Sequence, residues 1–181
     1  MKKLLTFLFA VMAIGLVSCN DDPSDSDNVL ASQLPGIWRL SNTYEVPVPD
    51  TNPTEYNTYS DTKTYEFKAN GEFYYSESTM KATDLKAMQW SVSGAWNVRK
   101  GLLQLNYDID SYRSSGFTET EVSQKLKDLK DSNALLKELN DGGHAYGPEI
   151  SFDVQNNKPV LKLAGYNGVF EKASYVSAPE K

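Results

Sequence analysis

The chain has 181 residues and a formal net charge of −6, with 24 acidic and 18 basic side chains. This balance argues against a nucleic-acid partner, because phosphate backbones are bound by basic surfaces. The chain has one cysteine, which excludes an internal disulfide. The length is sufficient for one domain with an ordinary hydrophobic core.

The N-terminus is typical of an export signal. Lys2 and Lys3 precede an apolar run from Leu4 to Val17, which is shorter than the roughly 20 apolar residues of a membrane-spanning helix. Residues 1–18 are therefore predicted to be a cleaved signal peptide. The alternative is a buried N-terminal helix.

The apolar run ends in LVSC at residues 16–19, which resembles the lipobox of bacterial lipoproteins. In proteins with this motif the cysteine sulfur receives a diacylglycerol, the chain is cut before the cysteine, and the new amino group is usually acylated. The resemblance implies that Cys19 is the lipidated first residue of the mature protein, with enough acyl chains for stable anchoring. Loss of Lys2 and Lys3 changes the net charge from −6 to −8 (16 basic against 24 acidic side chains), so we expect the lipid, and no basic face, to bind the membrane.

Residues 20–33 read NDDPSDSDNVLASQ. Few of these side chains can be buried, so the pattern predicts that residues 19–33 are the acylated cysteine and a flexible acidic tether. An acidic run after the cysteine also resembles the signal by which some Gram-negative bacteria export lipoproteins to the outer face of the outer membrane. We therefore expect an outer membrane lipoprotein of a Gram-negative bacterium, displayed on the cell surface. The alternative is a solvated linker, which leaves the membrane face open.

From Leu34 onward, apolar and polar residues alternate with the period of half-buried strands. Turn residues separate the runs, with Asn-Gly pairs at 70–71 and 167–168 and an Asn-Asn pair at 156–157. The alternation predicts these inward-facing residues: Trp38, Leu40, Tyr44, Val46, Tyr65, Phe67, Phe73, Tyr75, Trp90, Val92, Gly94, Trp96, Val98, Leu103, Leu105, Tyr107, Ile109, Ile150, Phe152, Val154, Leu161 and Leu163.

Residues 118–141 follow a helical pattern instead, with leucines and Val122 at spacings of three, four and seven. Thr118 and Glu121 fit a capping box, and Gly142-Gly143 fits a helix stop. One or two amphipathic helices are expected, which act as a lid on the sheet. A partner-binding helix is the alternative.

The predicted fold is all-β with a helical insertion at 118–141: about eight antiparallel strands over residues 34–177 form an up-and-down barrel, and the helix or helix pair precedes the last three strands. A two-sheet sandwich is the alternative. Closure is favoured because it removes exposed strand edges. The protein is expected to be a monomer.

Three segments carry a family resemblance: LPGIWRL with Gly36 and Trp38, FKANGEFYY, and SGAWNVRKGLLQLNY. Together with the lipobox they resemble the lipocalin-like domain of anchored Gram-negative lipoproteins. The resemblance implies a small barrel, often with an interior cavity. The chain departs from lipocalins in two ways. Its helix precedes the last three strands, and it lacks the arginine that often covers the first-strand tryptophan. Lys172 is the nearest candidate to take the place of that arginine.

Catalytic and metal-binding motifs are not expected. His144 is the only histidine, lipidation of Cys19 removes the only thiol, and Asp108 with Asp110 does not complete an EF-hand pattern. The sequence therefore predicts a non-enzymatic protein without a cofactor or metal.

The aromatic residues point to a binding function, because tyrosine and tryptophan combine an apolar face with a polar edge. We expect the mouth of the barrel to bind a small apolar or amphipathic ligand, or a carbohydrate. The alternative is a structural or protein-interaction module, including an inhibitor-type barrel, whose interior is filled by the same rings. The candidate ligand-binding residues are Tyr44, Tyr75, Trp90, Trp96, Tyr107 and Phe152.

Overall fold

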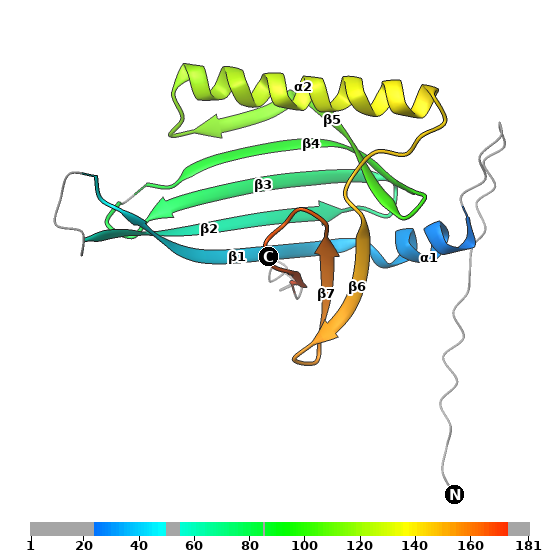
Figure 1. Cartoon of the computed structure of the whole chain (residues 1–181), viewed down its shortest axis with the longest axis horizontal. Coiled ribbons are helices and arrows are strands. Elements are labelled where there is room, and N and C mark those ends of the chain that lie inside the picture. Colours follow the sequence, from blue (N-terminus) through cyan, green and yellow to red (C-terminus); the bar gives the residue numbers. More distant parts are fainter. Residues whose placement is uncertain (1–23, 50–54, 85, 174–181) are drawn as a thin grey trace, which may run out of the picture.

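The computed structural model describes residues 24–49, 55–84 and 86–173, which form one eight-stranded antiparallel sheet and two helices (Figure 1). This confirms the predicted all-β class with a helical insertion, and shows one sheet in place of a two-sheet sandwich. The elements are α1 (Asp25–Gln33), β1 (Gly36–Pro47), β2 (Tyr56–Phe67), β3 (Glu72–Lys81), β4 (Met88–Arg99), β5 (Leu102–Ser115), α2 (Glu119–Asp141), β6 (Ile150–Gln155), β7 (Lys158–Leu163) and β8 (Phe170–Lys172).

The strands lie in the order β5-β4-β3-β2-β1-β8-β7-β6. The sheet curls, and its two edge strands meet at one end. There Leu102 and Glu149 form an isolated antiparallel bridge, and the Leu103 N–H donates a hydrogen bond to the Pro148 carbonyl. Beyond this point the described strands β5 and β6 share no ladder, so the sheet is curved but not closed.

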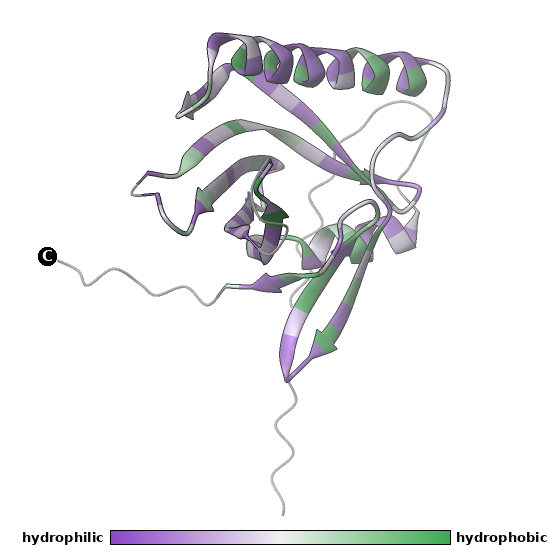
Figure 2. Ribbon diagram, turned by 60° about the vertical axis from the view of Figure 1, so that its left-hand side comes forward, coloured by the Kyte–Doolittle hydropathy of each residue, from purple (hydrophilic) through white to green (hydrophobic). Residues whose placement is uncertain are grey.

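The concave face of the sheet carries the core. Trp38 on β1 lies opposite Tyr65 on β2, which lies opposite Tyr75 on β3, and Val92 on β4 continues the row. All four are buried. Hydrophobic and hydrophilic residues alternate along the strands (Figure 2), as the period-two pattern predicts.

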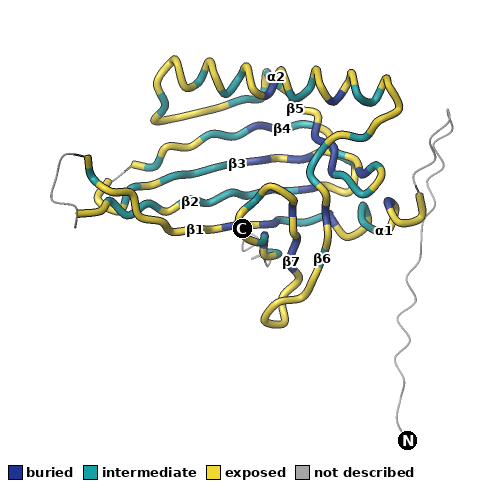
Figure 3. The backbone as a smooth tube through the Cα atoms, in the orientation of Figure 1, coloured by how far each residue is buried: buried dark blue, intermediate teal, exposed yellow. Residues whose placement is uncertain are grey.

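The part of the β1–β2 hairpin farthest from α1 extends beyond this core. Tyr44 is 44% exposed and Val46 is also exposed, although their alternation with Trp38 predicts an inward position. The strands are long enough to leave the packed region, and Figure 3 shows their mostly exposed end on the left. Val154, near the β6–β7 turn, is exposed for the same reason.

The predicted helix at 118–141 is one continuous helix, α2, and its capping box between Thr118 and Glu121 is present. The helix lies along the edge strand β5 (Figure 1). The Asn133 side chain accepts a hydrogen bond from the Tyr107 N–H and donates one to the Tyr107 carbonyl. Helix α2 thereby covers the edge of β5, where backbone groups would otherwise be unpaired.

Helix α1 occupies Asp25–Gln33, which the sequence assigned to the flexible tether. That expectation is wrong for these residues for two physical reasons. Leu30 and Ala31 pack against the core, and the Asp27 carboxylate accepts hydrogen bonds from the backbone N–H groups of Lys100 and Gly101. Residues 19–23 of the predicted tether, with Cys19, and the predicted signal peptide lie outside the described residues. Within the described part, no helix combines the length and apolar character that a membrane span requires.

Lys172 covers the tryptophan of the first strand. Its Nζ lies 5.0 Å from the centre of the Trp38 ring, and the two residues are paired across β1 and β8. Gly36 leaves room for this lysine: its φ is 135°, and a Cβ there would lie 2.8 Å from Lys172 Cε. A cation therefore covers the tryptophan of the first strand.

Candidate ligand-binding cavity

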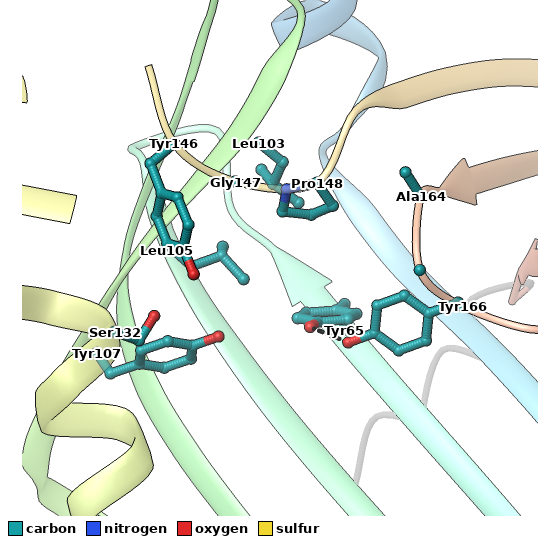
Figure 4. Close-up of a pocket in the computed structure, with 11 residues that line it drawn as sticks. Tyr65, Leu103, Leu105, Tyr107, Ser132, Tyr146, Gly147, Pro148, Ala164 and Tyr166 are labelled. Carbon is teal, nitrogen blue, oxygen red and sulfur yellow. Dashed lines mark hydrogen bonds between the residues drawn. The ribbon is translucent and has the colours of Figure 1, made fainter. Parts of the chain in front are cut away.

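A cavity of about 370 Å³ lies between the concave face of the sheet, helix α2 and two loops (Figure 4). The sheet contributes residues of β2 and β5, the helix contributes Ser132, and the loops that precede β6 and follow β7 close two further sides. The lining residues are Tyr65, Leu103, Leu105, Tyr107, Ser132, Tyr146, Gly147, Pro148, Ala164, Gly165 and Tyr166.

Four tyrosines give the cavity an aromatic and polar wall. The hydroxyls of Tyr65 and Tyr166 share a hydrogen bond of 2.9 Å, drawn in Figure 4. Burial raises the pKa values of Tyr65, Tyr107 and Tyr166 above the usual value of a phenol. These hydroxyls therefore stay neutral at physiological pH and can donate or accept hydrogen bonds.

The β5 side of the cavity also has an apolar part, which is fixed by close backbone packing. Leu103 and Leu105 point from β5 into the core and are buried. Gly147 lies directly against β5, where a Cβ would come within 2.0 Å of the Leu103 carbonyl oxygen, and its φ is 147°. Only glycine fits this position, so the loop that carries Tyr146 is held against the strand.

One of the six predicted ligand-binding residues, Tyr107, lines this cavity. Tyr75 contacts the back of Tyr65, with ring centres 4.6 Å apart. Trp96 packs edge-on against Phe67 and donates a hydrogen bond from its indole to the Lys68 carbonyl.

The other three predicted residues are also absent from the lining of this cavity. Phe152 packs against Trp38, with ring centres 5.6 Å apart. Trp90 lies beside Tyr75, and Lys125 of α2 covers its ring at 4.7 Å. Tyr44 stacks on Tyr59 in the exposed part of the hairpin.

Most of the lining does not follow from the sequence pattern. The strand alternation predicts only core positions for Tyr65, Leu103 and Leu105, and it carries no signal for Ser132, Tyr146 or Tyr166. A usable signal was present in the loops flanking β6 and β7, because each places a tyrosine beside a glycine, in AYGP and in AGYNG. Such loops can bring an aromatic ring against a sheet without an intervening side chain.

Among the described residues, no three histidine, cysteine, aspartate or glutamate side chains gather as a metal site. His144 is exposed in the loop after α2, and Asp108 and Asp110 are exposed on β5. Comparison with known proteins adds no assignment: no protein-family model and no curated protein sequence matches the chain.

Proposed function

We propose that the protein is a membrane-anchored, lipocalin-like lipoprotein that binds a small amphipathic molecule in the tyrosine-lined cavity and performs no catalysis. The observation that carries this proposal is the cavity itself. Its volume of about 370 Å³ falls within the range of about 300–1,000 Å³ that is usual for small-molecule sites. Its lining combines apolar walls with a few neutral hydroxyls, which suits a ligand with both characters.

Two features support a lipocalin-like barrel. The sheet curls until Leu102 of β5 forms an isolated bridge with Glu149, the residue before β6. Lys172 covers Trp38 where many lipocalins place an arginine. In this proposal α2 is the lid, since it supplies Ser132 to the cavity and lies along the edge of β5.

The anchor belongs to the same proposal. Five residues separate Cys19 from Asp25, the first residue of α1, and an extended chain spans at most about 3.6 Å per residue. A lipid on Cys19 would therefore hold the α1 end of the domain within about 20 Å of the membrane. We propose that this membrane is the outer membrane of a Gram-negative bacterium, with the domain on the cell surface.

Binding can be tested with N-phenyl-1-naphthylamine, a neutral apolar probe whose fluorescence rises in apolar sites. Saturable binding by the purified wild type is expected. Ser132→Trp places an indole at the cavity wall and should weaken binding by about tenfold or more. Lys130→Trp, at an exposed position of the same helix, is the matched control and should bind like the wild type. Equal binding by both variants would mean that the probe binds outside the tyrosine-lined cavity.

A second candidate function is a protein-interaction module of the inhibitor type. The observation in its favour is the projecting β1–β2 hairpin, which exposes Tyr44, Val46 and Tyr56. Exposed aromatic residues on a projecting segment are common in protein interfaces. A wild-type protein that binds no small probe would favour this alternative.

A further inference from the structure

Three charged side chains lie on the concave face of the sheet beside the cavity. Asp61 and Lys63 lie on β2, and Glu77 lies on β3 directly opposite Lys63. Lys63 is two residues from Tyr65, so both point to the same side of the strand. We call these three residues the charged cluster.

The cluster is bonded and partly shielded from water. Lys63 donates hydrogen bonds to both Asp61 and Glu77. The exposed fractions of the Lys63, Asp61 and Glu77 side chains are 22%, 13% and 21%. The cluster is thus within reach of a solute in the concave space.

Fold stability does not explain these charges. Removing ions from water costs free energy, and a partly buried ion cluster is often no more stabilising than apolar residues of similar size. Inward-pointing charges can protect the edge of a sheet from aggregation, but β2 and β3 are flanked by β1 and β4. The neighbouring inward positions hold Tyr65 and Tyr75, which are buried in the core.

The charged cluster retains hydrogen-bond donors and acceptors that its internal hydrogen bonds do not use. Glu77 accepts from Lys63, from the Tyr75 hydroxyl and from the Trp90 indole, and Asp61 accepts from Lys63 and Thr79. A carboxylate offers about four acceptor sites and an ammonium offers three donors. About one acceptor site on Glu77, two on Asp61 and one donor on Lys63 are left by these bonds.

This remaining capacity matches hydroxyl groups, because a hydroxyl both donates and accepts. A ligand ammonium can donate to the carboxylates but cannot accept from Lys63, and a ligand sulfate can accept from Lys63 but cannot donate to the carboxylates. Neighbouring hydroxyls of a sugar can use the free acceptors and the free donor together. The stacked pair of Tyr44 and Tyr59, whose ring centres are 5.7 Å apart, lies on the same face beyond Asp61 and offers flat aromatic surface beside such a ring.

The cluster is also continuous with the cavity. Tyr75 donates its hydroxyl hydrogen to Glu77 and contacts Tyr65, whose own hydroxyl is bonded to Tyr166 in the cavity wall. Along β2, Lys63 and Tyr65 are about 6.7 Å apart. One small molecule can therefore reach both places.

From these relationships we infer that the charged cluster binds the sugar head of a glycolipid-like ligand, whose apolar part lies in the tyrosine-lined cavity. The ligand is then a glycoside with an apolar aglycone or acyl chain. This inference rests on the proposed function, because it assigns a head-group site to the same ligand.

Three single-chain amphiphiles with the same tail can test it: octyl β-D-glucopyranoside, octylammonium and octyl sulfate, each below its micelle concentration. Each competes with bound N-phenyl-1-naphthylamine on the wild-type protein. The glucoside should displace the probe at about tenfold lower concentration than the two ions, because only its hydroxyls can both accept from Lys63 and donate to the carboxylates.

Glu77→Gln should abolish this preference, because a neutral amide replaces the charged acceptor that a sugar hydroxyl would use. Asp61→Asn is the second variant if Glu77→Gln does not fold, which circular dichroism will reveal. Glu72→Gln is the matched control, since Glu72 lies on the same strand and pairs with Lys68 at the exposed turn. It should retain the wild-type preference.

The two proposals fail in different ways. If the wild type binds the probe but the three amphiphiles compete equally, the sugar-head inference is wrong and the proposed cavity function stands. The same holds if folded Glu77→Gln and Asp61→Asn both keep the preference. If the wild type does not bind the probe, both proposals are wrong.

Discussion

The carboxylate of Asp27 accepts a hydrogen bond of 2.7 Å from the backbone N–H of Gly101, across 74 positions of the chain. Its other oxygen accepts one of 2.8 Å from the N–H of Lys100. Lys100 and Gly101 have φ angles of 54° and 75° and form the β4–β5 turn. One buried side chain thus joins the N-terminal helix to the sheet and pairs two N–H groups of a tight turn.

The Asp27 contact predicts a loss of stability on mutation. Asp27→Ala should lower the free energy of unfolding by about 1–3 kcal/mol at pH 7, because two N–H groups lose a charged acceptor. Urea denaturation measures the change. Asp25→Ala is the control, since Asp25 lies in the same first turn but is exposed. An equal effect in both variants would contradict a special role for Asp27.

The same contact predicts a pH dependence. Burial alone would raise the pKa of Asp27, but hydrogen bonds from Gly101, Lys100 and Ser24 outweigh it and lower the pKa below its usual value. A lowered pKa in the folded state gives stability that is present above the unfolded-state pKa, about 3.9, and is lost as the pH falls through the folded-state pKa. The difference between wild type and Asp27→Ala should therefore be constant from pH 5 to 7 and shrink below about pH 4. A difference that stays constant down to pH 2.5 would contradict this assignment.

Asp27 also shows why only part of the structure could be predicted. The strands were predictable because burial of one face repeats every two residues, as in Trp38 and Leu40, and α2 was predictable from its spacing and its Thr118 cap. The role of Asp27 depends on a turn that lies 73 and 74 positions away in the chain. The sequence around Asp27 does not indicate that this distant turn is its partner. The cavity could not be predicted for the same reason, since Tyr65, Tyr107 and Tyr166 come from three separate parts of the chain.

The contact of Lys172 with Trp38 predicts a second, specific effect. Lys172→Ala should reduce the free energy of unfolding by about 1 kcal/mol, through loss of the cation–π contact and of the packed methylene stem. Lys172→Arg should retain most of the stability, because a guanidinium also stacks on indole. Lys158→Ala, which removes an exposed ion pair with Glu171, is the control and should change stability by less than about 0.5 kcal/mol. If Lys172→Arg is as unstable as Lys172→Ala, the contact with the ring is not the cause.

The two hydrogen bonds between Asn133 and the Tyr107 backbone predict a local effect at the edge of the sheet. Asn133→Ala should speed amide hydrogen exchange at Tyr107 and lower the free energy of unfolding by about 1–3 kcal/mol, because a covered strand edge loses its partner. Hydrogen exchange measured by NMR locates the change. Gln124→Ala, on an exposed turn of the same helix, should leave exchange at Tyr107 unchanged. Unaltered exchange in Asn133→Ala would show that α2 does not protect β5.

The proposed anchor predicts a change of location without a change of stability. Cys19→Ala removes the only sulfur that could carry a diacylglycerol, so the protein expressed in a Gram-negative host should leave the detergent phase of a Triton X-114 separation, where the wild type is expected. Its unfolding by urea should match that of the wild type from which the lipid has been removed, because Asp27 joins α1 to the sheet. Ser18→Ala keeps a small residue before the cysteine and should partition like the wild type. A Cys19→Ala protein that stays in the detergent phase would mean that another part of the chain holds the membrane.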